Sequence, residues 1–206
     1  MRAGRLSKVH ECQVAELRPT QITVGMIEVH DKRRHLEQLG HHARRHYLAE
    51  HPIPAVFGPG GTLHITDHHH LARALWEARV EFGIVLVEAD LTELHPPAFW
   101  VEMATRQWVH PIDAEGRRHG VDALPEHVKQ LVDDPYRSLA GYVRDAGGYV
   151  KTGSAFAEFL WADFFRHRVR IAPGREGFEA AVRTALRLAH EPEARRLPGF
   201  LPAPRD

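Results

Sequence analysis

The first half of the chain alternates between short apolar runs and segments with helical periodicity. Residues 9–17 alternate weakly between apolar and polar, which predicts a first strand. Apolar residues at helical spacing predict a helix over 21–39, followed by a more polar helix over 41–51. Two short β runs around the turn at Gly58–Gly61 predict a hairpin over 52–67. The pattern is that of an α+β fold.

Two further apolar segments extend this pattern. Residues 68–78 place Leu71 and Leu75 on one helical face, so we expect a helix that packs on a sheet. Residues 82–90 are a continuous apolar run, which is typical of a buried strand. These segments favour a core that runs from residue 1 to residue 95.

After Asp90 the pattern becomes helical. A helix is expected over 96–109, with two prolines at its entry. Proline and glycine signals separate four further helical segments, at 124–132, 135–147, 154–169 and 174–190. We therefore expect an α+β core over 1–95 and a helical region over 96–206 that packs on it.

Composition narrows the class of protein. Of 206 residues, 43% are hydrophobic and 26% are charged, as in ordinary globular proteins. The 27 basic and 27 acidic residues give no net charge, which disfavours a protein held to DNA by a basic surface. A local basic patch remains open and would consist of Arg33, Arg34, Arg44 and Arg45.

The single cysteine and the ends of the chain set further limits. Cys12 is alone, so an intramolecular disulfide and a Cys-ligated zinc site are excluded, and we expect no haem or flavin. Residues 1–13 lack the apolar stretch of a signal peptide. No run approaches 18 apolar residues, so no membrane span is predicted. A cytoplasmic protein is the expectation.

The stretch 62–75, TLHITDHHHLARAL, carries four histidines. Consecutive histidines on a helix diverge by about 100° each, so three in a row cannot share one metal ion. Two-ligand spacings stay open at His64/His68 and His42/His46.

A helix that begins after a tight turn directs backbone N–H groups and its positive dipole end at an anion, which favours a phosphate site. Asp67 is the expected N-cap. We expect His69 to face the ligand and His68 to lie towards Leu71 and Leu75. His70 and Arg73 would extend the positive surface. The alternative is that Asp67 only caps the helix and the histidines are solvated or pack on aromatic rings.

The C-terminal half contains a second set of charged candidates. Asp134, after Asp133, is the expected N-cap of the helix that starts at Pro135. Arg137 and Arg144 are seven residues apart on one face, where they could clamp a phosphate or pair with carboxylates.

Asp163 follows Phe159 by four residues and Leu160 by three. This spacing predicts that its carboxylate points inward and pairs with one of the two arginines, either structurally or facing a nucleotide pocket. Glu158 is expected on a solvated side of the same helix. The tryptophans at 100, 108 and 161 favour core packing over base stacking.

Several segments together resemble the ParB-like nuclease family, and the likeness spans nearly the whole chain. They are LRPTQITVG (17–25), VFGPGGTLHITDHHHLARAL (56–75), DDPYRSLAGYVRDAGGY (133–149), EFLWADFFR (158–166) and LPGF (197–200). The resemblance implies a ParB/sulfiredoxin-like fold in the first half, in which ITDHHHLARAL takes the place of a phosphate-binding loop and helix. The catalytic cysteine of sulfiredoxins has no counterpart.

The resemblance further implies a nucleotide-dependent phosphohydrolase or phosphotransferase that uses Mg²⁺ with ATP or ADP and a small-molecule acceptor. Glu28 then occupies the position at which kinases of the superfamily hold their catalytic base. The alternative role for Glu28 is a surface ion pair with Lys32. Thr20 would cap the following helix, and Gln21, Lys32 and His68 would contact the nucleotide or its phosphates. Asp67 and His69 complete the expected catalytic set. The alternatives are a ParB-like DNA-binding protein or nuclease and a non-catalytic sensor.

Overall fold

The computed structural model describes residues 8–203, which divide into two compact units. Unit 1 comprises the described residues up to Val24 together with Glu28–Asp133, and unit 2 comprises Gly25–Ile27 together with the described residues from Asp134. The predicted boundary after residue 95 falls inside unit 1. The expected absence of a signal peptide concerns residues that lie largely outside the described range.

Unit 1 is built on a curled mixed sheet of five strands in the order β1-β6-β4-β5-β2, which confirms the α+β class. β1 is antiparallel to β6, β6 is parallel to β4, β4 is antiparallel to β5, and β5 is parallel to β2. The bounds are β1 Lys8–Gln13, β2 Leu17–Arg18, β4 Ile53–Phe57, β5 Leu63–Ile65 and β6 Phe82–Asp90. The β4–β5 pair is the predicted hairpin, and Gly60 provides the positive φ of its turn.

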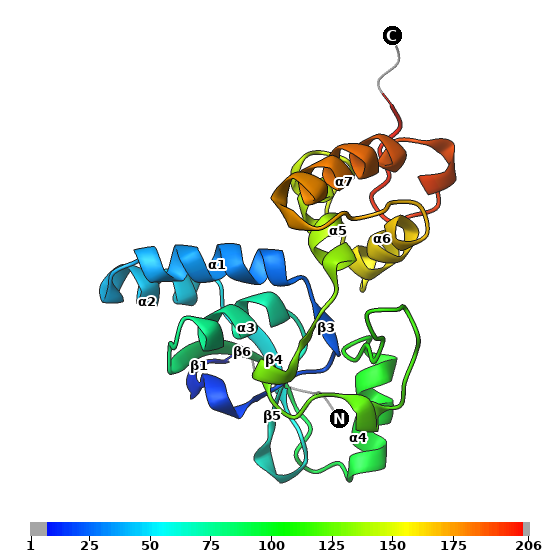
Figure 1. The fold of residues 1–206 in the computed structure, drawn as a ribbon. Helices are drawn as coiled ribbons and strands as arrows, with labels where there is room; N and C mark the ends of the chain where they lie inside the picture. The colour runs from blue at the N-terminus through cyan, green and yellow to red at the C-terminus, as the bar shows by residue number, and fades with distance from the viewer. Residues whose placement is uncertain (1–7, 204–206) are drawn as a thin grey trace. The chain divides into compact units, whose positions relative to one another are not determined.

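Four α-helices accompany this sheet (Figure 1). They are α1 Met26–Gln38, α2 His41–Glu50, α3 His69–Glu77 and α4 Pro96–Thr105. α1 begins five residues later than predicted, because Thr23–Val24 form β3, which pairs in parallel with β7 (Val132–Asp133). Thr20 therefore does not cap α1.

The helices bury the faces that their periodicity predicted. α3 buries Leu71 and Leu75, and Leu75 reaches Gly83 on β6. α4 buries Phe99 and Met103 in a cluster with Val56 of β4. Full burial of one such side chain contributes about 1.5–3 kcal/mol. α4 consequently belongs with the sheet, and the compact core extends beyond residue 95.

The helix predicted over 124–132 does not form. Only a 3₁₀ turn at Val128–Gln130 appears there, followed by β7. Arg73 explains the difference, because its Nη1 lies 2.7 Å from the carbonyl oxygen of Lys129 and 2.8 Å from that of Leu131. These carbonyls accept from a guanidinium on α3 and are not used in a helical ladder.

Unit 2 consists of α5 Pro135–Asp145, α6 Ala157–Arg166 and α7 Gly174–Ala189, which confirms the remaining three helices. Its core centres on Trp161, whose ring stacks on Tyr149 with centroids 4.3 Å apart. The other 3₁₀ turns of the described chain are Val14–Glu16, Pro59–Gly61, Val121–Ala123 and Pro192–Ala194. Within residues 8–203, every helix is too short or too polar to traverse a lipid bilayer.

Candidate functional site

The segment between β2 and β3 is fastened to the first turn of α3. The backbone N–H of Thr20 donates to Nε2 of His69 over 3.1 Å, and the Thr20 hydroxyl donates to the Ile65 carbonyl over 2.7 Å. His69 is 3% exposed, and its Nε2 must carry a lone pair to accept this bond. His69 is therefore a buried residue that holds the backbone at Thr20, contrary to the expectation that it faces a ligand.

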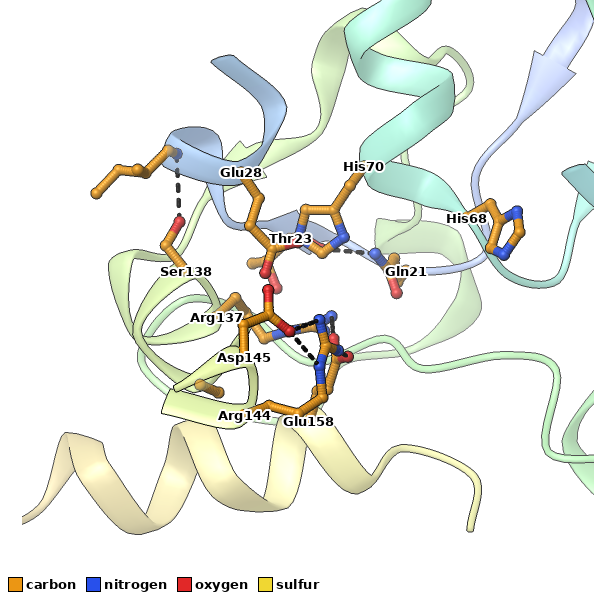
Figure 2. Close-up of polar contacts among 12 residues, drawn as sticks. Gln21, Thr23, Glu28, His68, His70, Arg137, Ser138, Arg144, Asp145 and Glu158 are labelled. Atoms are coloured by element: carbon orange, nitrogen blue, oxygen red, sulfur yellow. Dashed lines mark hydrogen bonds and ion pairs between the residues drawn. The ribbon is translucent and has the colours of Figure 1, made fainter. Parts of the chain in front are cut away.

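Glu28 and His70 bring a carboxylate and an imidazole together in the site. Glu28 Oε2 of α1 lies 3.8 Å from His70 Nε2 of α3, and the side chains are 16% and 11% exposed. Figure 2 shows the two side chains directed at one another. The surface ion pair with Lys32, which was the alternative role for Glu28, does not form within residues 8–203. A carboxylate beside an imidazole can orient the ring for proton transfer.

Gln21 and Thr23 lie next to this pair (Figure 2). Gln21 is 7% exposed and donates through Nε2 to the Thr23 carbonyl over 2.9 Å. Thr23 is 1% exposed, and within residues 8–203 its Oγ1 has no hydrogen-bond partner. A buried hydroxyl without a partner costs about 1–3 kcal/mol, so Thr23 marks a position where a polar ligand atom would be stabilising.

We call Gln21, Thr23, Glu28 and His70 the His70 cluster. All four belong to unit 1. Sequence reasoning named three of them but missed Thr23. The spacing of Thr23 could have indicated it. Thr23 follows Gln21 by two residues, and residues two apart on an extended chain point to the same side.

The start of α3 differs from the predicted Asp67 cap. The helix begins at His69, with His68 as N-cap in the left-handed region at φ 60°. Asp67 Oδ1 accepts from the His68 N–H, over 2.7 Å, and the N-cap residue His68 makes no side-chain cap hydrogen bond. Left-handed backbone at a non-glycine residue costs of order 1 kcal/mol and is found often at ligand sites. His68 is turned away from Glu28 and His70 in Figure 2.

Arg73 does not join the cluster as predicted. Its guanidinium donates to three backbone carbonyls at 128–131 and pairs with Glu77 at 2.7 Å. With its donors engaged in this way, Arg73 holds the 128–131 segment against α3. The expectation that it extends a phosphate-binding surface is wrong.

Unit 2 joins Arg137 and Arg144 through one carboxylate, that of Glu158. Arg137 Nη2 lies 3.6 Å from Glu158 Oε2, and Arg144 pairs with Glu158 and with Asp145 (Figure 2). The prediction that Glu158 is solvated is wrong. The two arginines do share a face, and that face binds a carboxylate of their own unit.

Asp163 points outward, contrary to prediction. Its side chain is 55% exposed and lies 3.7 Å from Arg166. Leu160, three residues before Asp163 on α6, is itself 47% exposed, so this side of the helix does not face the core. Asp134 is the predicted N-cap of α5, with Oδ1 accepting from the Tyr136 N–H over 3.0 Å, whereas Asp133 is exposed on β7.

Comparison with known proteins assigns the family. The family model described as "Putative ParB-like nuclease" matches residues 10–167, more than half of the chain. The chain belongs to this ParB-like family. A crystal structure of protein Atu1540 from Agrobacterium tumefaciens is similar at a TM-score of 0.88 and 38% identity, over 96% of this chain and 98% of that one. No curated protein matches the sequence.

Three of the four arginines in the basic patch considered for nucleic acid have a carboxylate nearby. Arg33 pairs with Glu37 at 3.5 Å, Arg34 pairs with Asp31, and Arg45 pairs with Glu11 at 3.3 Å. Arg44 donates to the backbone carbonyls at 36 and 39. These carboxylates lower the positive potential of the patch, although each exposed pair contributes only about 0–1 kcal/mol.

A protein-held metal centre does not fit the described residues. No three His, Cys, Asp or Glu side chains between residues 8 and 203 converge in a way that could hold an ion. We therefore derive no step that depends on a metal bound by the protein alone.

His64 makes the stability of unit 1 depend on pH. Burial, and then the charge of Arg18, lowers the pKa of His64 to about 4. Its ring lies against Phe99, and its Nε2 is 3.0 Å from the Thr62 hydroxyl. The unfolded chain binds a proton near pH 6.5 and the folded chain near pH 4. Stability is therefore complete above pH 6.5 and falls between these values, by about 3 kcal/mol.

Replacing His64 by leucine tests this dependence. In urea denaturation, we expect His64→Leu to remove most of the difference in unfolding free energy between pH 7 and pH 4, about 3 kcal/mol. His42→Leu, at an exposed histidine on α2, should keep the wild-type difference. Parallel pH profiles for wild type and His64→Leu would show that His64 has an ordinary pKa in the fold.

Proposed function

We propose that the chain binds a nucleotide through its phosphates at the His70 cluster and transfers or hydrolyses a phosphoryl group. The observation that carries this proposal is the Glu28–His70 pair, 3.8 Å apart, beside the unpartnered hydroxyl of Thr23. His70 lies in the first turn of α3, whose N-cap residue His68 makes no side-chain cap hydrogen bond. A helix N-terminus favours an anion, and a phosphate oxygen would accept a hydrogen bond from Thr23.

In this proposal the cluster contributes a proton acceptor, His70, and a hydroxyl donor, Thr23, to phosphoryl transfer. In the proposed reaction, the His70 imidazole accepts the proton of the attacking hydroxyl, and the Glu28 carboxylate, 3.8 Å from its Nε2, stabilises the imidazolium that forms. The attacking oxygen bonds to phosphorus as the bond to the leaving phosphate breaks. Mg²⁺ would arrive with ATP or ADP, bound mainly by phosphates and water, and would neutralise their charge.

Glu28→Gln tests the catalytic half of the proposal. We expect phosphate release from ATP or CTP to fall about 100-fold, because the amide cannot stabilise the His70 imidazolium. The matched control is Glu50→Gln, which removes the carboxylate from the exposed His46–Glu50 pair at 3.3 Å and should leave release unchanged. Nucleotide binding without release would identify a sensor and contradict the enzymatic assignment. Equal rates in both variants would remove Glu28 from the chemistry.

The family description favours a second candidate, a ParB-like DNA-binding protein or nuclease. The neutral net charge and the paired arginines count against it. A gel shift with duplex and single-stranded DNA at about 50 mM salt tests it, because non-specific binding is strong there. A shift, or cleavage that Glu28→Gln abolishes, would replace the nucleotide proposal with this one.

A further inference from the structure

Thr20 fixes the segment that leads from β2 into β3, and all three of its polar groups take part. Its N–H donates to Nε2 of His69 over 3.1 Å, and its hydroxyl donates to the Ile65 carbonyl over 2.7 Å. Its carbonyl accepts from the His110 N–H over 2.8 Å. Thr20 is 1% exposed, so water has little access to compete for these bonds. The segment is therefore held at one residue by three separate parts of unit 1.

His69 is the one side chain among these three partners. Ile65 and His110 offer a carbonyl and an N–H of the backbone, which almost any residue would provide. His69 offers a ring nitrogen, and a leucine or alanine in its place would leave the buried Thr20 N–H without this acceptor. Of the three bonds, the bond to His69 is thus the one that depends on the identity of the partner residue.

His69 and His70 are adjacent on α3 but make different contacts. Successive side chains on a helix diverge by about 100°. His69 accordingly turns to Thr20, whereas His70 lies 3.8 Å from Glu28. The proposed reaction uses His70, so the role of His69 lies elsewhere, in the position of Thr20.

The position of Thr20 determines where the cluster residues Gln21 and Thr23 lie. Residues 19–22 belong to no strand, and Gln21 is paired with His110 through an isolated bridge. Gln21 follows Thr20 directly, and its Nε2 donates to the Thr23 carbonyl over 2.9 Å. A displacement of the Thr20 backbone is therefore passed on to both cluster residues.

We propose that His69 is a positioning residue of the nucleotide site. Its Nε2 fixes Thr20, and Gln21 and Thr23 thereby keep their places in the cluster, while His69 itself makes no contact with the nucleotide. The inference rests on the proposed function, because the affinity for nucleotide is what the positioning changes. A different side chain that places an acceptor at the same point should serve as well as histidine.

Two substitutions of His69 and calorimetry with ATP and CTP on the full chain test this role. His69→Leu keeps a similar bulk but removes the acceptor, whereas the side-chain oxygen of His69→Gln can reach the position of Nε2. We expect His69→Leu to bind nucleotide at least about 10-fold more weakly than the wild type, and His69→Gln to stay within about 3-fold of it. Amide hydrogen exchange at Thr20 should be faster in His69→Leu than in the other two proteins.

Leu48→Ala is the control for a general loss of stability. Leu48 is a buried residue of α2, and its truncation should destabilise the fold but leave the affinity for nucleotide unchanged. If Leu48→Ala weakens nucleotide binding as much as His69→Leu does, the effect is one of stability, and the positioning role is overturned.

The outcomes separate this inference from the proposed function. A wild type that binds no nucleotide would remove the proposed function and the inference together. Wild-type binding that His69→Leu retains, or that His69→Gln loses as fully as His69→Leu, would overturn the positioning role alone. Rapid exchange of the Thr20 amide in the wild type would overturn it as well, so the result does not depend on a variant folding.

Discussion

Asp134→Ala should lower the unfolding free energy of unit 2 by about 3–5 kcal/mol. Asp134 is 1% exposed, and both of its carboxylate oxygens accept from Arg166, over 3.1 and 2.8 Å. One of these oxygens also caps α5 through the Tyr136 N–H. Removing the carboxylate breaks a buried ion pair and uncaps a helix, and both effects destabilise the fold. Urea denaturation followed by circular dichroism measures the loss.

Asp163→Ala is the matched control for this variant. Asp163 contacts the same arginine at 3.7 Å, but its side chain is 55% exposed. Because exposed ion pairs contribute about 0–1 kcal/mol, the control should lose less than about 1 kcal/mol. Equal losses in the two variants would contradict the assignment of Asp134 as the buried partner.

Trp161→Ala should destabilise unit 2 by about 3–5 kcal/mol, because it opens a cavity in the helical core. The indole is 0% exposed, stacks on Tyr149 and donates through Nε1 to the Pro198 carbonyl over 2.8 Å. Trp161→Phe keeps an aromatic ring but loses that donor and some volume, and we expect a loss of about 1–3 kcal/mol.

Trp76→Ala provides the comparison, since Trp76 is 37% exposed on α3. Chemical denaturation of the three variants should rank the losses as Trp161→Ala, Trp161→Phe and Trp76→Ala. A Trp161→Ala protein as stable as the wild type would show that the core of unit 2 can collapse around the missing ring.

The helices of unit 2 and the β4–β5 hairpin were predictable because their signals are local. A stripe of apolar side chains or a glycine turn acts within a few residues of its own position. The elements that were predicted wrongly depend on contacts with residues far away in the sequence. The segment at 124–132 has a helical pattern, yet Arg73, more than 50 residues earlier, binds its carbonyls. The start of α1 depends in the same way on β3 pairing with β7.

The candidate site was likewise predictable only where its residues have local signals or a family resemblance. The resemblance pointed to Glu28 and Gln21, and helix geometry pointed to the start of α3. Which histidine faces Glu28 depends on how α1 lies against α3, and the pattern of three adjacent histidines does not contain that information. Thr23 was missed because an unpartnered hydroxyl becomes visible only when all neighbouring donors and acceptors are placed.

Calorimetric titration of ATP and CTP into four proteins tests the central claim most directly. The four are the wild type, His70→Gln, Thr23→Val and, as a surface control, His46→Gln at the exposed pair with Glu50. We expect binding by the wild type and by His46→Gln, and binding that is about 10-fold weaker or more for His70→Gln and Thr23→Val. Absence of nucleotide binding at millimolar concentration, or equal affinity in all four proteins, would contradict a phosphate site at the His70 cluster.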